Sequence, residues 1–129
     1  MHHRWLTITG ILGAVGVSLG AFGAHGLRAI LPLQRMTIFE TAVRYHFYHV
    51  LALFGIAVCM AVFPERAPGL RTSARLMLTG VVMFSGSLYA LAVSDLTFLR
   101  LVTPLGGLCW VAGWITLAWA FRGEAPPRA

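Results

Sequence analysis

The sequence predicts an all-α protein that forms a single integral membrane bundle of four transmembrane helices. Of the 129 residues, 58% are hydrophobic and only 11% are charged, and the mean hydropathy is +0.79. A soluble domain carries about 25% charged residues, and a small one buries only about 60% of its chain surface. The surplus of apolar side chains must therefore face lipid. Four apolar runs each approach the length of about 20 residues that crosses a bilayer, so residues 1–129 form one transmembrane domain.

The four apolar runs define the predicted spans. They cover residues 5–24, 45–63, 76–93 and 101–121. The first run follows Arg4 and is long enough to be a span, which distinguishes it from a signal peptide. The helix of the second span should begin earlier, near Thr37, and measure about 40 Å at 1.5 Å per residue. Pro64 ends this helix, whereas Pro104 falls in the first turn of the fourth span, where its missing N–H costs nothing.

The placement of the basic residues argues against nucleic-acid binding. The formal net charge is +6 and all ten basic residues are arginines, but they stand singly where apolar runs end. A nucleic-acid-binding protein would cluster them on one face among aromatic residues. The predicted side with both termini carries Arg4, Arg66, Arg71, Arg75, Arg122 and Arg128, and the other side carries Arg28, Arg35, Arg44 and Arg100. The positive-inside rule then places both termini in the cytoplasm and the protein in the cytoplasmic (inner) membrane.

Small residues recur at helical spacing and are expected to form packing faces. The predicted packing positions are Gly13, Gly16, Gly20, Gly23, Gly86, Gly106 and Gly113. Small residues let helix backbones approach closely in lipid, where packing replaces the hydrophobic driving force. Tight packing of the bundle is the favoured interpretation, and the lining of a cleft or pore is the alternative.

Ionisable and aromatic residues gather between the first two spans and form the candidate ligand-binding site. Glu40 and Arg44 are four residues apart in the acid-first order that favours a helical ion pair. Tyr45 and His49 follow on the same helix, and His25 ends the first span. Because a short connection makes the two helices antiparallel neighbours, we expect His25, Glu40, Arg44 and His49 to converge near one membrane face. Ionisable groups at membrane depth are functional candidates, although a structural salt bridge is the simpler alternative.

Metal and haem sites have little support in the sequence. Imidazole and carboxylate ligands from His25, His46, His49 and Glu40 could bind a metal, but the chain has no HExxH motif and no cysteine pair at ligand spacing. The third and fourth predicted spans contain no histidine that could hold a haem. We therefore expect no metal and no cofactor. An amphipathic crevice for a quinone or lipid headgroup remains the sharpest alternative, since His, Tyr and Arg all occur at interface depth.

Catalytic motifs are also missing from the sequence. Ser85 and Ser87 flank Gly86 within a predicted helix, without the nucleophile elbow of a hydrolase. Asp95 falls in a loop, where the sequence assigns it no partner. We therefore expect that the protein is not an enzyme.

Four sequence motifs resemble a family of small membrane proteins of unknown function. They are GAFGAHGL at residues 20–27, FETAVRYHFYH at 39–49, FSGSLY at 84–89 and TPLGG at 103–107. The family includes bacterial YgdD-like and YwdK-like proteins and a mitochondrial relative in animals. The resemblance implies a four-span bundle, brings no activity, and marks His25, Glu40, Arg44, Tyr45, His49, Ser85, Gly86, Tyr89 and Pro104 as motif positions.

Two hypotheses for function follow from these features. The first is a non-catalytic accessory or structural subunit of a larger membrane assembly, with membrane lipids and other membrane proteins as partners. The small extramembrane mass and the wide apolar surface favour it. The alternative is a carrier or binder of an amphipathic ligand such as a quinone or lipid. No acidic residue lies deep in a predicted span, which argues against proton-coupled transport.

Overall fold

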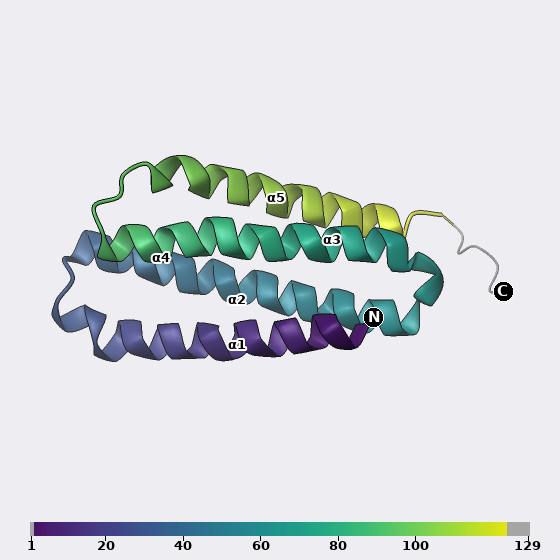
Figure 1. Cartoon of the computed structure of the whole chain (residues 1–129), viewed down its shortest axis with the longest axis horizontal. Coiled ribbons are helices and arrows are strands. Elements are labelled where there is room, and N and C mark those ends of the chain that lie inside the picture. Colours follow the sequence, from purple (N-terminus) through teal and green to yellow (C-terminus); the bar gives the residue numbers. More distant parts are fainter. Residues whose placement is uncertain (1, 124–129) are drawn as a thin grey trace.

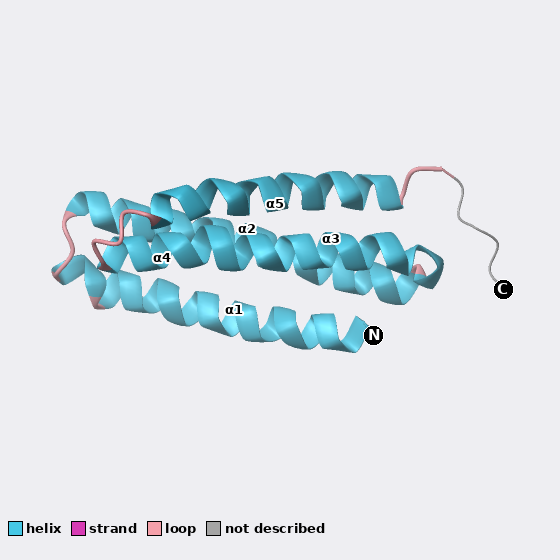
Figure 2. Cartoon of the chain, turned by 45° about the horizontal axis from the view of Figure 1, so that its top comes forward, coloured by secondary structure: helices cyan, strands magenta, loops and turns pink. Residues whose placement is uncertain are grey.

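The computed structural model describes residues 2–123 and shows four long antiparallel helical segments (Figure 1). Their elements are α1 (His2–His25), η1 (Leu27–Ala29), α2 (Leu33–Val62), η2 (Pro64–Arg66), α3 (Ala67–Gly80), η3 (Val81–Ser85), α4 (Gly86–Val93) and α5 (Leu99–Ala120). The described residues contain helices and connecting turns, and no strand (Figure 2). Arg128, which entered the predicted charge asymmetry, lies outside the described residues.

Each of the four segments is long and apolar enough to cross a membrane. The candidate spans are His3–Ala29, Leu33–Val62, Pro64–Val93 and Leu99–Ala120. The second and third segments start earlier than the predicted spans, because α2 already begins directly after Pro32 and the third segment directly after Phe63. With 30 residues, α2 is about 45 Å long, so it exceeds a hydrocarbon core of about 30 Å. Its ends therefore reach the headgroup regions.

The third segment is one continuous helical rod with an irregular middle. It runs from α3 through η3, a single stretch of π-helix, into α4. This rod and α2 form the centre of the bundle. The outer helices lie on opposite sides of that pair, with α1 packed on α2 and α5 packed mainly on α3 and η3 (Figures 1 and 2).

Two groups of buried side chains hold the bundle together. The larger one joins α2, α3, η3 and α5 and consists of Val50, Leu53, Ile56, Met60, Leu70, Ala74, Met77, Val81 and Trp110. The smaller one lies near the η1 turn and consists of Leu27, Met36, Phe39 and Ala92. Many other large apolar side chains are exposed, among them Leu101, which is 76% exposed, and Trp119, which is 68% exposed. Such a surface is stable only in lipid.

Most of the glycines predicted to pack do face a neighbouring helix. A Cβ atom at Gly16 would lie 3.0 Å from the Phe47 ring, and one at Gly23 would lie 2.7 Å from the Phe39 ring. Gly20 faces Val43, Gly106 faces the backbone of Phe84, and Gly113 faces Leu76 and Met77. These positions let α1 approach α2 and let α5 approach α3 and η3.

Two of the predicted packing glycines do not pack against the described chain. A Cβ atom at Gly13 or Gly86 would meet no atom within 4 Å. Gly13 is turned about 60° around α1 from Gly16, because each residue rotates by about 100°. Gly86 points outward because Ser85 bonds to α2 and Ser87 bonds to α5. Gly80, in contrast, lies directly against the Trp110 ring.

Candidate functional site

The turn between α1 and α2 carries an ion pair that the sequence assigned differently. The Arg28 Nη2 atom donates to the Glu40 Oε1 atom at 3.0 Å. The predicted pair of Glu40 with Arg44 is therefore wrong. The reason is that η1 folds back over the start of α2 and brings Arg28 to Glu40 from outside the helix. The pair is exposed to solvent, with 68% of the Arg28 side chain and 45% of the Glu40 side chain accessible.

A second ion pair explains Asp95, for which the sequence offered no partner. The Arg35 guanidinium donates to the Asp95 carboxylate. The two residues are 60 positions apart in the chain, so no local spacing could reveal them. The pair ties the loop between α4 and α5 to the first turn of α2.

A groove between α1 and α2 gathers two of the predicted site residues. Its cavity measures about 180 Å³ and is lined by Gly20, Gly23, Ala24, Met36, Phe39, Glu40, Val43 and Arg44. An adjoining cavity of about 330 Å³ lies toward the η1 turn and is lined by Arg28, Leu31, Leu33, Met36, Thr37 and Glu40. Both cavities share Met36 and Glu40. Together they form a crevice that is charged toward the turn and largely apolar between the helices.

The other predicted site residues do not join this groove. Tyr45 and His49 contact Trp110 of α5 on a different side of α2. Each helical residue turns by about 100°, so His49 points about 140° away from Arg44. His25 is exposed and lines neither cavity. The predicted convergence of His25, Glu40, Arg44 and His49 is therefore wrong, and only Glu40 and Arg44 share a site.

His49 is part of an aromatic stack inside the bundle. Its ring lies 3.6 Å from the Trp110 ring with an angle of 4° between the planes. The Nδ1 atom lies 2.9 Å from the Tyr45 carbonyl oxygen, which can only accept, so Nδ1 carries the proton. The Nε2 atom then accepts from the Trp114 indole N–H at 3.3 Å. The Nδ1 bond stays within α2, whereas the Nε2 bond and the ring stack hold α2 against α5.

His46, which was not among the predicted site residues, connects three helices. It is 2% exposed. Its Nε2 atom donates to the Leu12 carbonyl oxygen of α1 at 2.8 Å, and its Nδ1 atom accepts from the Tyr89 hydroxyl of α4 at 3.1 Å. Gly16 leaves the space for this contact, since a Cβ atom there would lie 3.2 Å from the His46 Nε2 atom. No sequence motif could reveal a bond to a helix carbonyl.

The described histidines and acidic residues do not form a metal site. Within residues 2–123, no three His, Cys, Asp or Glu side chains come close enough to hold a metal ion. His46 and His49 face different helices, and Glu40 lies at the α1–α2 groove. The metal alternative considered for His25, His46, His49 and Glu40 therefore lacks a common centre.

Comparison with known proteins identifies relatives that cover nearly the whole chain. Residues 19–107 match the family described as "Protein of unknown function (DUF423)". The UPF0382 membrane protein YwdK of Bacillus subtilis is 42% identical over 111 residues, which cover 83% of this chain and 89% of that protein. A UPF0382 membrane protein of Haemophilus influenzae is 36% identical over 126 residues, which cover 97% of this chain and 99% of that protein.

A third relative bears a name that specifies the membrane. The UPF0382 inner membrane protein YgdD of Escherichia coli K12 is 40% identical over 111 residues, covering 84% of this chain and 82% of that protein. No solved structure matches the fold. The four apolar helices and the near full-length matches show that this chain is a multi-pass membrane protein belonging to the UPF0382 (DUF423) family.

Proposed function

We propose that the protein binds an amphipathic molecule in the groove between α1 and α2. This proposal rests on one observation. Residues 20–27 and residues 39–49, which are two of the sequence motifs, both line that groove. Gly20 and Gly23 of the first segment face Glu40 and Arg44 of the second across one cavity. The proposal assigns binding, and no catalytic step, to these residues.

The Arg44 side chain indicates which chemical groups the headgroup of the ligand carries. Glu40 already accepts a hydrogen bond from Arg28, and Arg44 takes part in neither ion pair of the described chain. The Arg44 side chain is exposed at the groove, and a guanidinium prefers carbonyl, carboxylate or phosphate oxygens. The ligand is thus a molecule whose headgroup presents oxygen acceptors. A quinone and a phospholipid both have this chemistry.

The size of the groove limits what it can enclose. Pockets that enclose a drug-sized ligand measure about 300–1,000 Å³, whereas this cavity measures about 180 Å³. It has room for a quinone ring or one part of a lipid headgroup. The rest of the molecule would remain in the surrounding bilayer, along the apolar outer surface of α1 and α2.

The test compares the lipophilic molecules that co-purify with matched variants. Gly20→Leu fills the groove without a backbone clash, because a Cβ atom there would lie 3.5 Å from Val43. Gly10→Leu is the control, since a Cβ atom at Gly10 meets no atom within 4 Å. Each protein is purified from its native membrane in mild detergent, and the bound molecules are extracted and identified by mass spectrometry.

We expect wild type and Gly10→Leu to retain about one quinone or lipid per chain. Gly20→Leu and Arg44→Gln should retain at least tenfold less, which corresponds to about 1.4 kcal/mol. The mass of the molecule distinguishes a quinone from a phospholipid. Equal retention by Gly10→Leu and Gly20→Leu would contradict the proposal, as would the lack of any bound molecule in the wild type.

A second candidate function is that of an accessory subunit in a larger membrane assembly, and the outer face of α1 supports it. Gly10 and Gly13 meet no described atom there, while Ile11 and Val17 are 59% and 62% exposed. Small residues beside exposed apolar ones provide a surface on which another helix can pack. Gly10→Leu would then remove a stoichiometric partner that the wild type retains in mild detergent. Purification of the wild type as a lone chain would contradict this role.

We further propose that the end of the bundle with the α1 N-terminus lies in the cytoplasm. Its described arginines are Arg4, Arg66, Arg71, Arg75 and Arg122, and the opposite end has Arg28, Arg35, Arg44 and Arg100. The excess on the first side supports this orientation under the positive-inside rule. The name of the Escherichia coli relative supports the inner membrane.

A further inference from the structure

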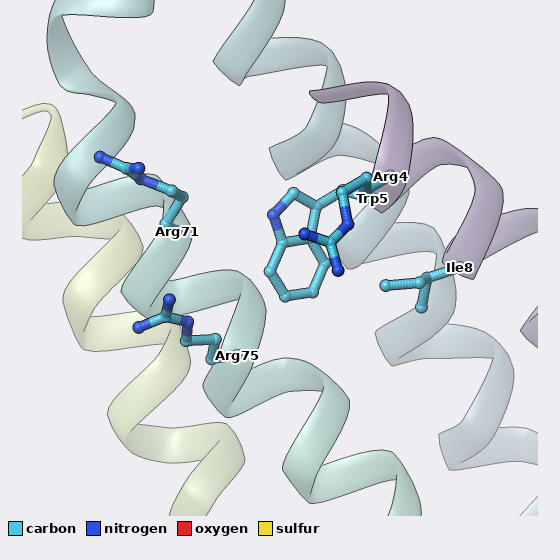
Figure 3. Close-up of a pocket in the computed structure, with 5 residues that line it drawn as sticks. All are labelled: Arg4, Trp5, Ile8, Arg71 and Arg75. Carbon is cyan, nitrogen blue, oxygen red and sulfur yellow. The ribbon is translucent and has the colours of Figure 1, made fainter. Parts of the chain in front are cut away.

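A second concavity lies at the opposite end of the bundle from the α1–α2 groove. Its volume is about 240 Å³, and Arg4, Trp5 and Ile8 of α1 and Arg71 and Arg75 of α3 line it (Figure 3). Three of these five side chains are cationic and none is acidic. An anion in this concavity is attracted electrostatically by these cationic side chains.

Two other arginines at this end make contacts outside the concavity, and the Nε atom of Arg71 itself donates to the Ala67 carbonyl oxygen at 3.3 Å. Arg66 donates to the carbonyl oxygens of Ala120 and Gly123 at 2.7 Å and 3.2 Å. The Arg122 guanidinium lies over the Trp119 ring, 5.8 Å from its centre.

The concavity lies at the depth of the lipid headgroups. Arg4 is in the first turn of α1, and the candidate span of α1 begins at His3. Arg75 lines the same concavity as Arg4, so it lies at the same level although it belongs to the middle of α3. With 24 residues, α1 is about 36 Å long, which is only slightly longer than a hydrocarbon core of about 30 Å. The boundary between hydrocarbon and water therefore falls near the start of α1.

The remaining two lining residues make the concavity amphipathic. Trp5 packs against the larger core group, and Ile8 packs there one turn deeper along α1. Tryptophan is enriched at the level of lipid headgroups because its ring has an apolar body and a polar N–H. A molecule that places an anion among the arginines therefore has an apolar wall beside it, directed toward the bilayer.

We propose that this concavity binds the phosphate group of an anionic phospholipid from the surrounding leaflet. Guanidinium groups bind phosphate through paired, charge-assisted hydrogen bonds, and basic pockets between transmembrane helices suit anionic headgroups. The apolar wall favours a lipid over a soluble phosphate, which would leave Trp5 and Ile8 uncovered. This site is separate from the α1–α2 groove and does not depend on the function proposed for that groove.

The experiment measures lipid binding to the whole protein with native mass spectrometry in detergent. Phosphatidylglycerol is titrated against wild type, Arg75→Gln and the double variant Arg4→Gln/Arg75→Gln. Arg122→Gln is the matched control, because it removes the same charge at the same end but lies outside the concavity. Phosphatidylcholine replaces phosphatidylglycerol in one arm, and inorganic phosphate competes in another. A thermal melt of each variant verifies the fold.

We expect Arg75→Gln to weaken phosphatidylglycerol binding about fivefold and the double variant about 25-fold, at about 1 kcal/mol per arginine. Arg122→Gln should stay within twofold of wild type, phosphatidylcholine should bind at least tenfold more weakly, and millimolar phosphate should not displace the lipid. Equal losses in Arg75→Gln and Arg122→Gln would overturn the proposal, and so would equal binding of the two lipids. Displacement by phosphate would assign the site to a soluble anion instead.

A conservative variant keeps the test decisive if Arg75→Gln lowers stability. Arg75→Lys retains the charge but loses the paired donor geometry of arginine, so its lipid affinity should lie between wild type and Arg75→Gln. The proposal would also be overturned if Arg75→Gln and Arg75→Lys both bound phosphatidylglycerol as tightly as Arg122→Gln does. Gly20→Leu should leave phosphatidylglycerol binding at this concavity unchanged. The variant therefore distinguishes lipid binding here from ligand binding in the α1–α2 groove.

Discussion

The His49 imidazole of α2 lies face to face with the Trp110 indole of α5, 3.6 Å between ring centres. Trp110 is fixed in turn by a hydrogen bond from its Nε1 atom to the Met77 carbonyl oxygen at 3.1 Å, and it rests on Gly80. This arrangement joins α2, α3 and α5 in the centre of the bundle. A histidine that the sequence marked as a ligand is thus a packing residue.

The contact of Trp110 with Gly80 predicts a large cost for a small substitution. Gly80→Ala would place its Cβ atom 2.2 Å from the Trp110 ring, which is 4% exposed. We expect a loss of about 1–3 kcal/mol in the free energy of unfolding, typical of an overpacked core. Gly86→Ala is the control, since its Cβ atom meets nothing within 4 Å. A chemical denaturation series in detergent measures both; equal stabilities would refute the packing described here.

Two adjacent glycines of α5 provide a still closer comparison. A Cβ atom at Gly106 would overlap the backbone of Phe84, whereas one at Gly107 would lie 3.8 Å from the Phe84 ring. Gly106→Ala should therefore destabilise the protein by about 1–3 kcal/mol, because backbone cannot rotate aside. Gly107→Ala should be neutral or stabilising by up to about 1 kcal/mol, since alanine favours the helix. Thermal melts in the same detergent compare the stabilities of the two variants. A Gly107→Ala variant less stable than Gly106→Ala would contradict the structure.

The bond between His46 and Tyr89 should make a measurable coupling between α2 and α4. Hydrogen bonds between membrane helices contribute about 0.6 kcal/mol on average and up to about 1.7 kcal/mol. We expect a coupling within this range in a double-mutant cycle of His46→Leu and Tyr89→Phe. Tyr48→Phe serves as a control for the loss of a hydroxyl, because Tyr48 is 56% exposed. Strictly additive effects of the two substitutions would show that the bond contributes nothing.

The exposed Arg28–Glu40 pair should contribute little to stability. Exposed ion pairs are worth about 0–1 kcal/mol, because water and salt screen the charges. Glu40→Gln should therefore change the free energy of unfolding by less than about 1 kcal/mol, and raising the salt concentration should reduce even this effect. A loss above about 2 kcal/mol would mean that the pair locks the η1 turn to α2, contrary to its exposure.

The orientation is tested by labelling single cysteines in whole cells. Cys59 and Cys109 are first replaced by alanine, and a cysteine is then introduced at Thr97, in the loop between α4 and α5, or at Gly123, after α5. We expect a membrane-impermeant maleimide to label the Thr97→Cys variant directly and the Gly123→Cys variant only after permeabilisation. The opposite pattern would place the termini outside the cytoplasm.

The sequence alone determined the class of the protein, the number of spans and the family. The composition and the length of the apolar runs indicate how much surface must face lipid. Neither quantity depends on which helices contact each other. The motif segments at residues 20–27 and 39–49 likewise identified the two helices that form the groove. The order and approximate positions of the helices followed from the same local signals, including Pro64 as a helix end.

The choice of partners was decided only by the tertiary structure. Helical spacing suggested Arg44 as the partner of Glu40, but η1 brings Arg28 to that carboxylate instead, and the fold joins Arg35 to Asp95 across 60 positions. His46 and His49 are three residues apart, yet one bonds to α1 and α4 and the other stacks on α5. The physical reason is that the rotation of a helix about its axis, and the close approach that a glycine permits, are set by all the neighbouring helices together. A spacing along one helix contains no information about those neighbours.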